Sequence, residues 1–135
     1  MHIGKAVRQM TDKYLEVANK YSRRLPQIGD IYTHFKGNTV YIIALAIDTE
    51  TLHPSIVYRH EDDTWVRPLE MFLSDVDKEK YPNSVQQYRF ERVLPSGIKE
   101  SNKFKELISN YKSIKDFDNY SDSELETYIL QHYFL

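Results

Sequence analysis

Cationic and aromatic side chains are interleaved in the centre of this chain of 135 residues. The segments are Tyr32-Thr33-His34-Phe35-Lys36, Val57-Tyr58-Arg59 and Trp65-Val66-Arg67. A cation can bind a phosphate or carboxylate while a neighbouring aromatic ring packs on a planar group. The candidate ligand-binding residues are therefore His34, Lys36, Arg59, Trp65, Arg67, Tyr32 and Tyr58. This combination indicates recognition of an anionic, nucleotide-like ligand.

A structural role is the alternative for the two strand arginines. Arg59 and Arg67 could form ion pairs with carboxylates such as Asp62, Glu70 or Glu50 and so fix the loops. If their strands are adjacent and antiparallel, the two arginines lie close to the hairpin end and could converge on one face, which would favour a binding role. Both interpretations remain open from the sequence.

Catalytic and metal sites are weakly indicated. His34 and Lys36 could act as a base and an electrophile, but no paired carboxylate or nucleophilic serine is identifiable beside them. His60 precedes three acidic residues, yet adjacent side chains seldom all point at one ion, and no second histidine has motif spacing. The usual nucleotide-loop, zinc-protease and serine-hydrolase motifs are absent. We therefore expect a non-enzymatic protein with no catalytic residue, no metal and no cofactor.

Length and composition are those of one globular domain, with 41% hydrophobic and 28% charged residues. The chain has no cysteine, which excludes disulfides. No apolar run approaches the roughly 20 residues needed to span a bilayer, and polar residues interrupt the N-terminal segment. These features predict a soluble, cytoplasmic protein without a membrane partner. Abundant lysine, isoleucine and tyrosine are typical of AT-rich bacterial or phage genomes.

The N-terminal segment, residues 1–25, is predicted to be a helix that ends before Pro26. Its apolar residues recur at steps of four and three: Ile3, Val7, Met10, Tyr14, Val17 and Tyr21. This stripe could cover the core of its own chain or form the seam of a homodimer or higher homo-oligomer. The first 24 residues are also basic, whereas the C-terminal segment is acidic, so the two ends could pair, or the basic arm could contact nucleic acid.

The central segment, residues 28–95, has the alternation and turns of a β structure. Strands are predicted at 31–35, 39–47, 55–59, 64–67 and 87–93, with a helical turn or short strand at 69–73. The nearly all-apolar run at 39–47 is typical of a strand covered on both faces. Five short strands predict an α+β fold with a small, strongly bent antiparallel sheet or an SH3-like β-barrel.

The C-terminal segment, residues 100–135, returns to helical periodicity and is predicted to hold two helices. Ser101 is a plausible cap for the first, and Ser121-Asp122-Ser123-Glu124 has the pattern of a capping box for the second. Together with the N-terminal helix, these helices would flank the β core. We expect residues 1–135 to form a single domain.

Residues 28–93 resemble a bacterial and phage family of domains of unknown function, number sixteen fifty-three in its series. The resemblance rests on Tyr32-Thr33-His34-Phe35-Lys36-Gly37-Asn38, on Val57-Tyr58-Arg59 and above all on Trp65-Val66-Arg67-Pro68-Leu69-Glu70-Met71-Phe72. The chain departs from the family at Asp48 and in the short turn at 60–63. The resemblance implies a compact β fold and no established activity. Within the motif, Trp65, Met71 and Phe72 are expected to be core residues, with Trp65 the best placed to reach a surface pocket.

Two functions are compatible with these features. The preferred one is a binding module for an anionic, nucleotide-like small molecule or single-stranded nucleic acid, such as a phage protein that sequesters a nucleotide signal. The alternative is a protein-interaction adaptor that acts through its terminal helices.

Overall fold

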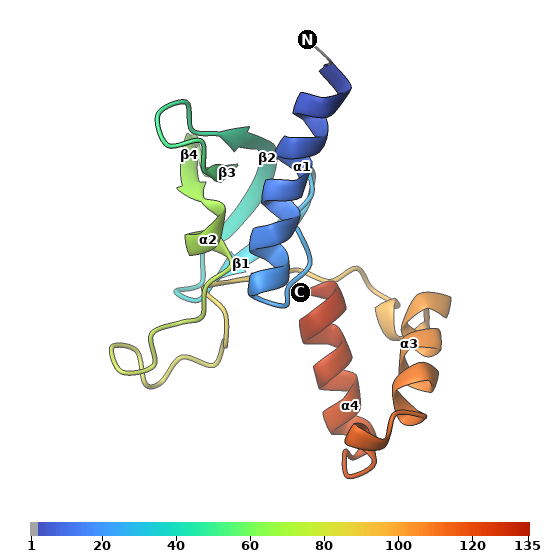
Figure 1. Cartoon of the computed structure of the whole chain (residues 1–135). Helices are drawn as coiled ribbons and strands as arrows, with labels where there is room; N and C mark the ends of the chain where they lie inside the picture. Colours follow the sequence, from blue (N-terminus) through green and yellow to red (C-terminus); the bar gives the residue numbers. More distant parts are fainter. Residues whose placement is uncertain (1–2) are drawn as a thin grey trace. The chain divides into compact units, whose positions relative to one another are not determined.

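The computed structural model describes the backbone of residues 3–135 and the side chains from residue 12 onward. The chain divides into two compact units, Met1–Val93 and Leu94–Leu135, which are described separately below (Figure 1). The expected α+β class is confirmed, with an N-terminal helix, an antiparallel sheet and C-terminal helices. A single domain over residues 1–135 stays a prediction.

The first unit opens with helix α1 (Ile3–Lys20). Tyr14, Val17 and Tyr21 from the apolar stripe pack into the core of this unit, and the Tyr14 hydroxyl donates a hydrogen bond to the Ala46 carbonyl at 2.6 Å. The described part of the stripe therefore covers the chain's own core. Ile3, Val7 and Met10 lie outside the described side chains, and a homodimer stays a prediction.

Five strands form one antiparallel sheet in the order β4-β3-β2-β1-β5. Their bounds are β1 (Ile31–His34), β2 (Thr39–Ile47), β3 (Pro54–His60), β4 (Asp63–Pro68) and β5 (Phe90–Arg92). The expected strands are confirmed, although β5 is shorter than the predicted 87–93. β4 and β5 are the two edges, so the sheet is open and an SH3-like barrel is not shown.

The segment after β4 is a helical turn, α2 (Leu69–Phe72), because Pro68 ends the strand. α1 and α2 cover one end of one sheet face, where Ile56, Leu69 and Phe72 are fully buried. Phe72 is therefore a core residue, as expected. Trp65 and Met71 are not, because they are about half exposed, and the prediction that they belong to the core is wrong.

Strand β2 contains an irregularity between Ile42 and Ala44, where the pairing register with β3 shifts. Ile42 is buried, whereas Tyr41 and Ile43 are exposed. The prediction that both faces of this strand are covered is wrong for this half of β2. Its apolar run indicates β-branched and aromatic propensity here rather than burial on both sides.

The second unit contains the helices α3 (Asn102–Lys112) and α4 (Asp122–Ile129). A short 3-10 turn at Ile98–Glu100 precedes α3, and another at Lys115–Phe117 separates the two helices. A π-helical turn at Leu130–Phe134 follows α4. Both predicted caps are confirmed. Ser101 accepts a hydrogen bond from the Phe104 amide, and Ser121 and Glu124 form a reciprocal capping box. The core of this unit is built from Phe104, Leu125, Ile129 and Phe134.

Among the described residues, no helix is long and apolar enough to cross a membrane. A cytoplasmic location and an adaptor role for the terminal helices stay predictions.

Candidate functional site

An aromatic cavity of about 250 Å³ lies on the sheet of the first unit. Residues that are paired directly across antiparallel strands point to the same face. Alternation along β1 and β2 links the pairs His34–Phe90 and Tyr58–Trp65 through Tyr32–Val40 and Ile42–Tyr58, so all of these residues share one face. α1 and α2 cover one end of that face, and the cavity opens at the other. Its lining is His34, Asn38, Val40, Tyr58, His60, Trp65, Arg67 and Phe90.

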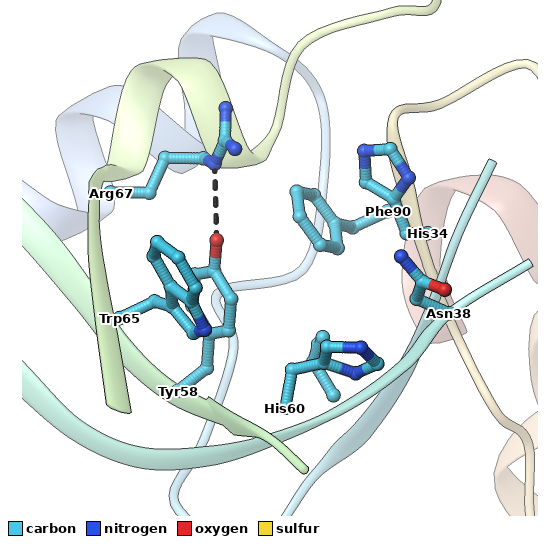
Figure 2. A pocket seen from close by; sticks show the side chains of 8 residues that line it. His34, Asn38, Tyr58, His60, Trp65, Arg67 and Phe90 are labelled. Carbon is cyan, nitrogen blue, oxygen red and sulfur yellow. Dashed lines mark hydrogen bonds between the residues drawn. The ribbon is translucent and has the colours of Figure 1, made fainter. Parts of the chain in front are cut away.

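Figure 2 shows Tyr58, Trp65 and Arg67 on one side of this aromatic cavity and His34, Phe90 and Asn38 on the other. The Arg67 Nε donates a hydrogen bond to the Tyr58 hydroxyl at 3.3 Å (Figure 2). The Arg67 guanidinium also lies 5.6 Å from the centre of the Phe90 ring. Arg67 is therefore held by two aromatic residues.

A second cavity of about 400 Å³ lies beside the first and shares His34 and Arg67 with it. We call it the cationic cavity because four of its lining residues are basic: Lys36, Arg67, Lys80 and Arg89. Asp77 is the single acidic residue among the described residues that line it. One carboxylate oxygen of Asp77 accepts hydrogen bonds from the amides of Glu79 and Lys80, which shapes the loop that carries Lys80.

Among the described residues, the four cations of the cationic cavity lack acidic partners. In the part of the chain that the structure describes, none of them has a carboxylate oxygen within 4.0 Å. Glu70, a possible partner for Arg67 in the sequence, instead pairs with Lys20 at 2.6 Å. The Arg89 Nε is buried and has no hydrogen-bond partner among the described residues. The ion-pair interpretation is therefore not observed for Arg67.

The electrostatics of His34 are consistent with a positive potential here. Burial, followed by the charges of Arg67, Lys36 and Arg89, lowers the pKa of His34 to about 4. Its Nδ1 accepts a hydrogen bond from the Lys36 amide at 3.2 Å. His34 is therefore a neutral imidazole near pH 7, and its Nε2 carries the proton and can donate a hydrogen bond.

Tyr81 lies at the rim of the cationic cavity, and its hydroxyl is also affected by the positive potential there. A hydrogen bond with Lys36, followed by the charges of Lys36 and Lys80, lowers the pKa of its hydroxyl. Cations that stabilise a phenolate would equally stabilise a bound phosphate or carboxylate.

The structure brings five of the seven sequence-predicted residues to the two adjoining cavities. His34, Tyr58, Trp65 and Arg67 line the aromatic cavity, and Lys36 lines the cationic one. Tyr32 does not reach either cavity. It is fully buried and packs edge-on against Phe72, and its burial raises the pKa of its hydroxyl to about 12.

Arg59 lies on the opposite face from Arg67. Arg59 pairs with Thr64 and Arg67 pairs with Ile56, and positions 56 and 59 differ by three. Because successive side chains of a strand alternate between faces, an odd separation places the two arginines on different faces. The expectation that Arg59 and Arg67 converge is therefore wrong. The Arg59 guanidinium contacts the Asp62 carbonyl instead, at 3.5 Å.

Sequence reasoning missed Lys80 and Arg89. Both belong to the segment between α2 and β5, which has no regular periodicity and is fixed by long-range backbone contacts. The Arg89 amide donates to the Ser74 carbonyl, and the Phe35 amide donates to the Arg89 carbonyl. The only sequence signal was the turn-forming Asp77, which did not indicate where the loop would pack.

Comparison with known proteins finds a match to one family model. The family model described as "Protein of unknown function (DUF1653)" matches residues 30–92, which include all five strands and both cavities. The resemblance noted in the sequence is confirmed. No curated protein and no solved structure matches the chain.

Proposed function

Since residues 30–92 match the model of the DUF1653 family of unknown function, we propose from this chain's own geometry that it is a non-enzymatic binding module for an anionic, nucleotide-like ligand. The observation that carries the proposal is the set of four cations around one cavity with no acidic partner among the described residues, beside a cavity lined by aromatic rings. This arrangement offers an anion site and a stacking surface side by side.

Electrostatics favours an anion in this position. Clustered like charges repel one another, and a bound phosphate or carboxylate would offset that repulsion while accepting hydrogen bonds from Arg67 and Arg89. Arginine suits this role because its planar fork matches two oxygens of such a group. The side chain of Arg89, with its Nε unpartnered, is the strongest single indication of an absent acceptor.

The ligand class includes small nucleotides and single-stranded nucleic acid. A protein of this kind could sequester a nucleotide signal in a bacterial or phage-infected cell, which agrees with the cytoplasmic location expected from the sequence. No step of this proposal requires turnover.

The experiment that tests the proposal compares two arginines on neighbouring strands and opposite faces. Native mass spectrometry of gently purified protein, with inorganic phosphate then added to the ligand-free form, should detect a bound anion. Arg67→Ala should lose it, and Arg59→Ala, the matched control, should retain it. Loss with Arg59→Ala but not with Arg67→Ala would overturn the proposed site.

A second measurement reports from within the site. Phosphate in the cationic cavity should raise the pKa of His34 above about 4, because a nearby anion stabilises the imidazolium. NMR titration of His34 with and without phosphate measures this shift within each variant. If phosphate causes no shift and no anion binds, the binding-module proposal fails and the adaptor alternative gains support.

A further inference from the structure

The aromatic and cationic cavities share a wall, because His34 and Arg67 line both of them. At about 250 Å³, the aromatic cavity alone is smaller than the usual range of roughly 300–1,000 Å³ for small-molecule sites. A ligand that fills it would therefore extend past these two residues into the cationic cavity of about 400 Å³.

The chemistry changes across that wall. On one side are the rings of Tyr58, Trp65 and Phe90, with Trp65 50% exposed and so accessible to a ligand. On the other side are Lys36, Lys80 and Arg89. A ligand that matches both halves carries a planar ring at one end and a compact anion at the other.

Polar groups at the wall and rim can recognise the ring. The Asn38 side-chain amide makes no hydrogen bond within the described part of the chain and offers both a donor and an acceptor. His34 presents its Nε2 proton, since its Nδ1 is occupied by the Lys36 amide. Because His34 is neutral, it can separate the two ends of a ligand without adding a charge beside the ring.

We propose that the ligand is a nucleoside monophosphate, or a small molecule of that chemistry, with its base in the aromatic cavity and its phosphate in the cationic cavity. This inference rests on the proposed function and deepens it. A nucleic-acid strand fits less well, because it needs a cationic track with successive stacking positions. Here the stacking rings lie together in the aromatic cavity, and Arg59 lies on the opposite face of the sheet, so these described residues form a compact site rather than a track.

Isothermal titration calorimetry with AMP, GMP, CMP, UMP, adenosine, ribose 5-phosphate and inorganic phosphate tests this inference. At least one mononucleotide should bind about tenfold or more tightly than ribose 5-phosphate or inorganic phosphate, since stacking adds to the anion contacts. AMP should also bind more tightly than adenosine. Arg89→Ala should weaken the binding of both AMP and ribose 5-phosphate.

Trp65→Ala separates the two halves of the site. It should weaken mononucleotide binding about tenfold and leave ribose 5-phosphate unchanged. Tyr41→Ala is the matched control, because Tyr41 is similarly exposed, at 53%, and pairs with Arg59 on the opposite face. Circular dichroism of each variant verifies the fold.

The outcomes distinguish the inference from the proposed function. If ribose 5-phosphate binds as well as every mononucleotide, or if Trp65→Ala changes neither, the anion site stands and the two-cavity inference is overturned. Tighter binding of an oligothymidylate than of any mononucleotide would also overturn it. If no anionic probe binds, the proposed function itself fails.

Discussion

The guanidinium of Arg23 lies 4.0 Å from the centre of the Tyr88 ring, and Arg23 is buried, with only 4% of its surface exposed. Its two terminal nitrogens donate hydrogen bonds to the carbonyls of Leu73 and Phe90, at 3.2 and 2.8 Å. Burial lowers the pKa of Arg23. One side chain from the segment that follows α1 thus joins the two ends of the segment that carries Lys80 and Arg89.

Arg23→Met should destabilise the first unit by about 2–4 kcal/mol, because two buried carbonyls would lose their charged donor. Urea denaturation followed by circular dichroism measures the loss. Lys20→Met is the control, since Lys20 forms an exposed ion pair with Glu70 and its loss should lower the urea midpoint far less than Arg23→Met does. Equal effects of the two substitutions would contradict the assigned role of Arg23.

The stability of the first unit should depend on pH through His34. Its pKa is about 4 in the folded chain, against 6.5 for the ordinary side chain, so the unfolded chain takes up the proton first as the pH falls. The contribution of neutral His34 to the free energy of unfolding is therefore complete above about pH 6.5, and it decreases as the pH falls towards about 4.

The effect of His34 on stability is isolated by measuring urea midpoints across this pH window for the parent chain and for His34→Gln. The glutamine variant has no imidazole and should lose less stability between the two limits. Parallel pH profiles for the two proteins would show that His34 is not the responsible group.

Glu61 adopts a left-handed backbone conformation, with φ of 56°, in the two-residue turn between β3 and β4. This conformation costs an ordinary residue roughly 1 kcal/mol or more and a glycine almost nothing. Glu61→Gly should therefore raise the free energy of unfolding by about 0.5–1 kcal/mol, after the extra entropy of glycine in the unfolded chain.

Glu61→Ala is the control for this turn, because it removes the exposed carboxylate but keeps the strained backbone. It should give no comparable gain in a thermal denaturation experiment. If alanine and glycine stabilise equally, the gain comes from the lost charge near Asp62 and Asp63 rather than from the backbone.

Ser121→Ala should destabilise α4 by about 0.5–2 kcal/mol, because the Glu124 amide loses the acceptor of the capping box. Hydrogen exchange of the first turn of α4 measures this loss. Ser123→Ala is the matched control two residues later, where the side chain makes no hydrogen bond in the described structure and alanine is a good helix former. Similar exchange rates in both variants would contradict a capping role.

Elements with strong local signals could be predicted from the sequence. The capping box at Ser121 and Glu124 is a local pattern, and the strand pair around Gly37 combines alternation with a turn. The open sheet could not be predicted in the same way. Whether β4 and β5 meet depends on how the whole sheet bends, which no local pattern encodes.

The candidate site was predicted in part for a related reason. His34, Tyr58, Trp65 and Arg67 were identified by residue type, and strand pairing brings them together. Placing Arg59 required the strand register, because a difference of one residue moves a side chain to the other face. Arg89 required knowledge of where an irregular segment packs, which depends on tertiary contacts.

The edge position of β4 has a consequence for association between chains. An unpaired edge can add a strand from another molecule and start aggregation. β4 has six residues, begins at Asp63 and ends at Pro68, which has no amide hydrogen to donate. This short edge, with a charge at one end and a proline at the other, disfavours strand addition. Trp65 can therefore stay accessible on this edge strand, while the strand offers only a short edge to which another chain could pair.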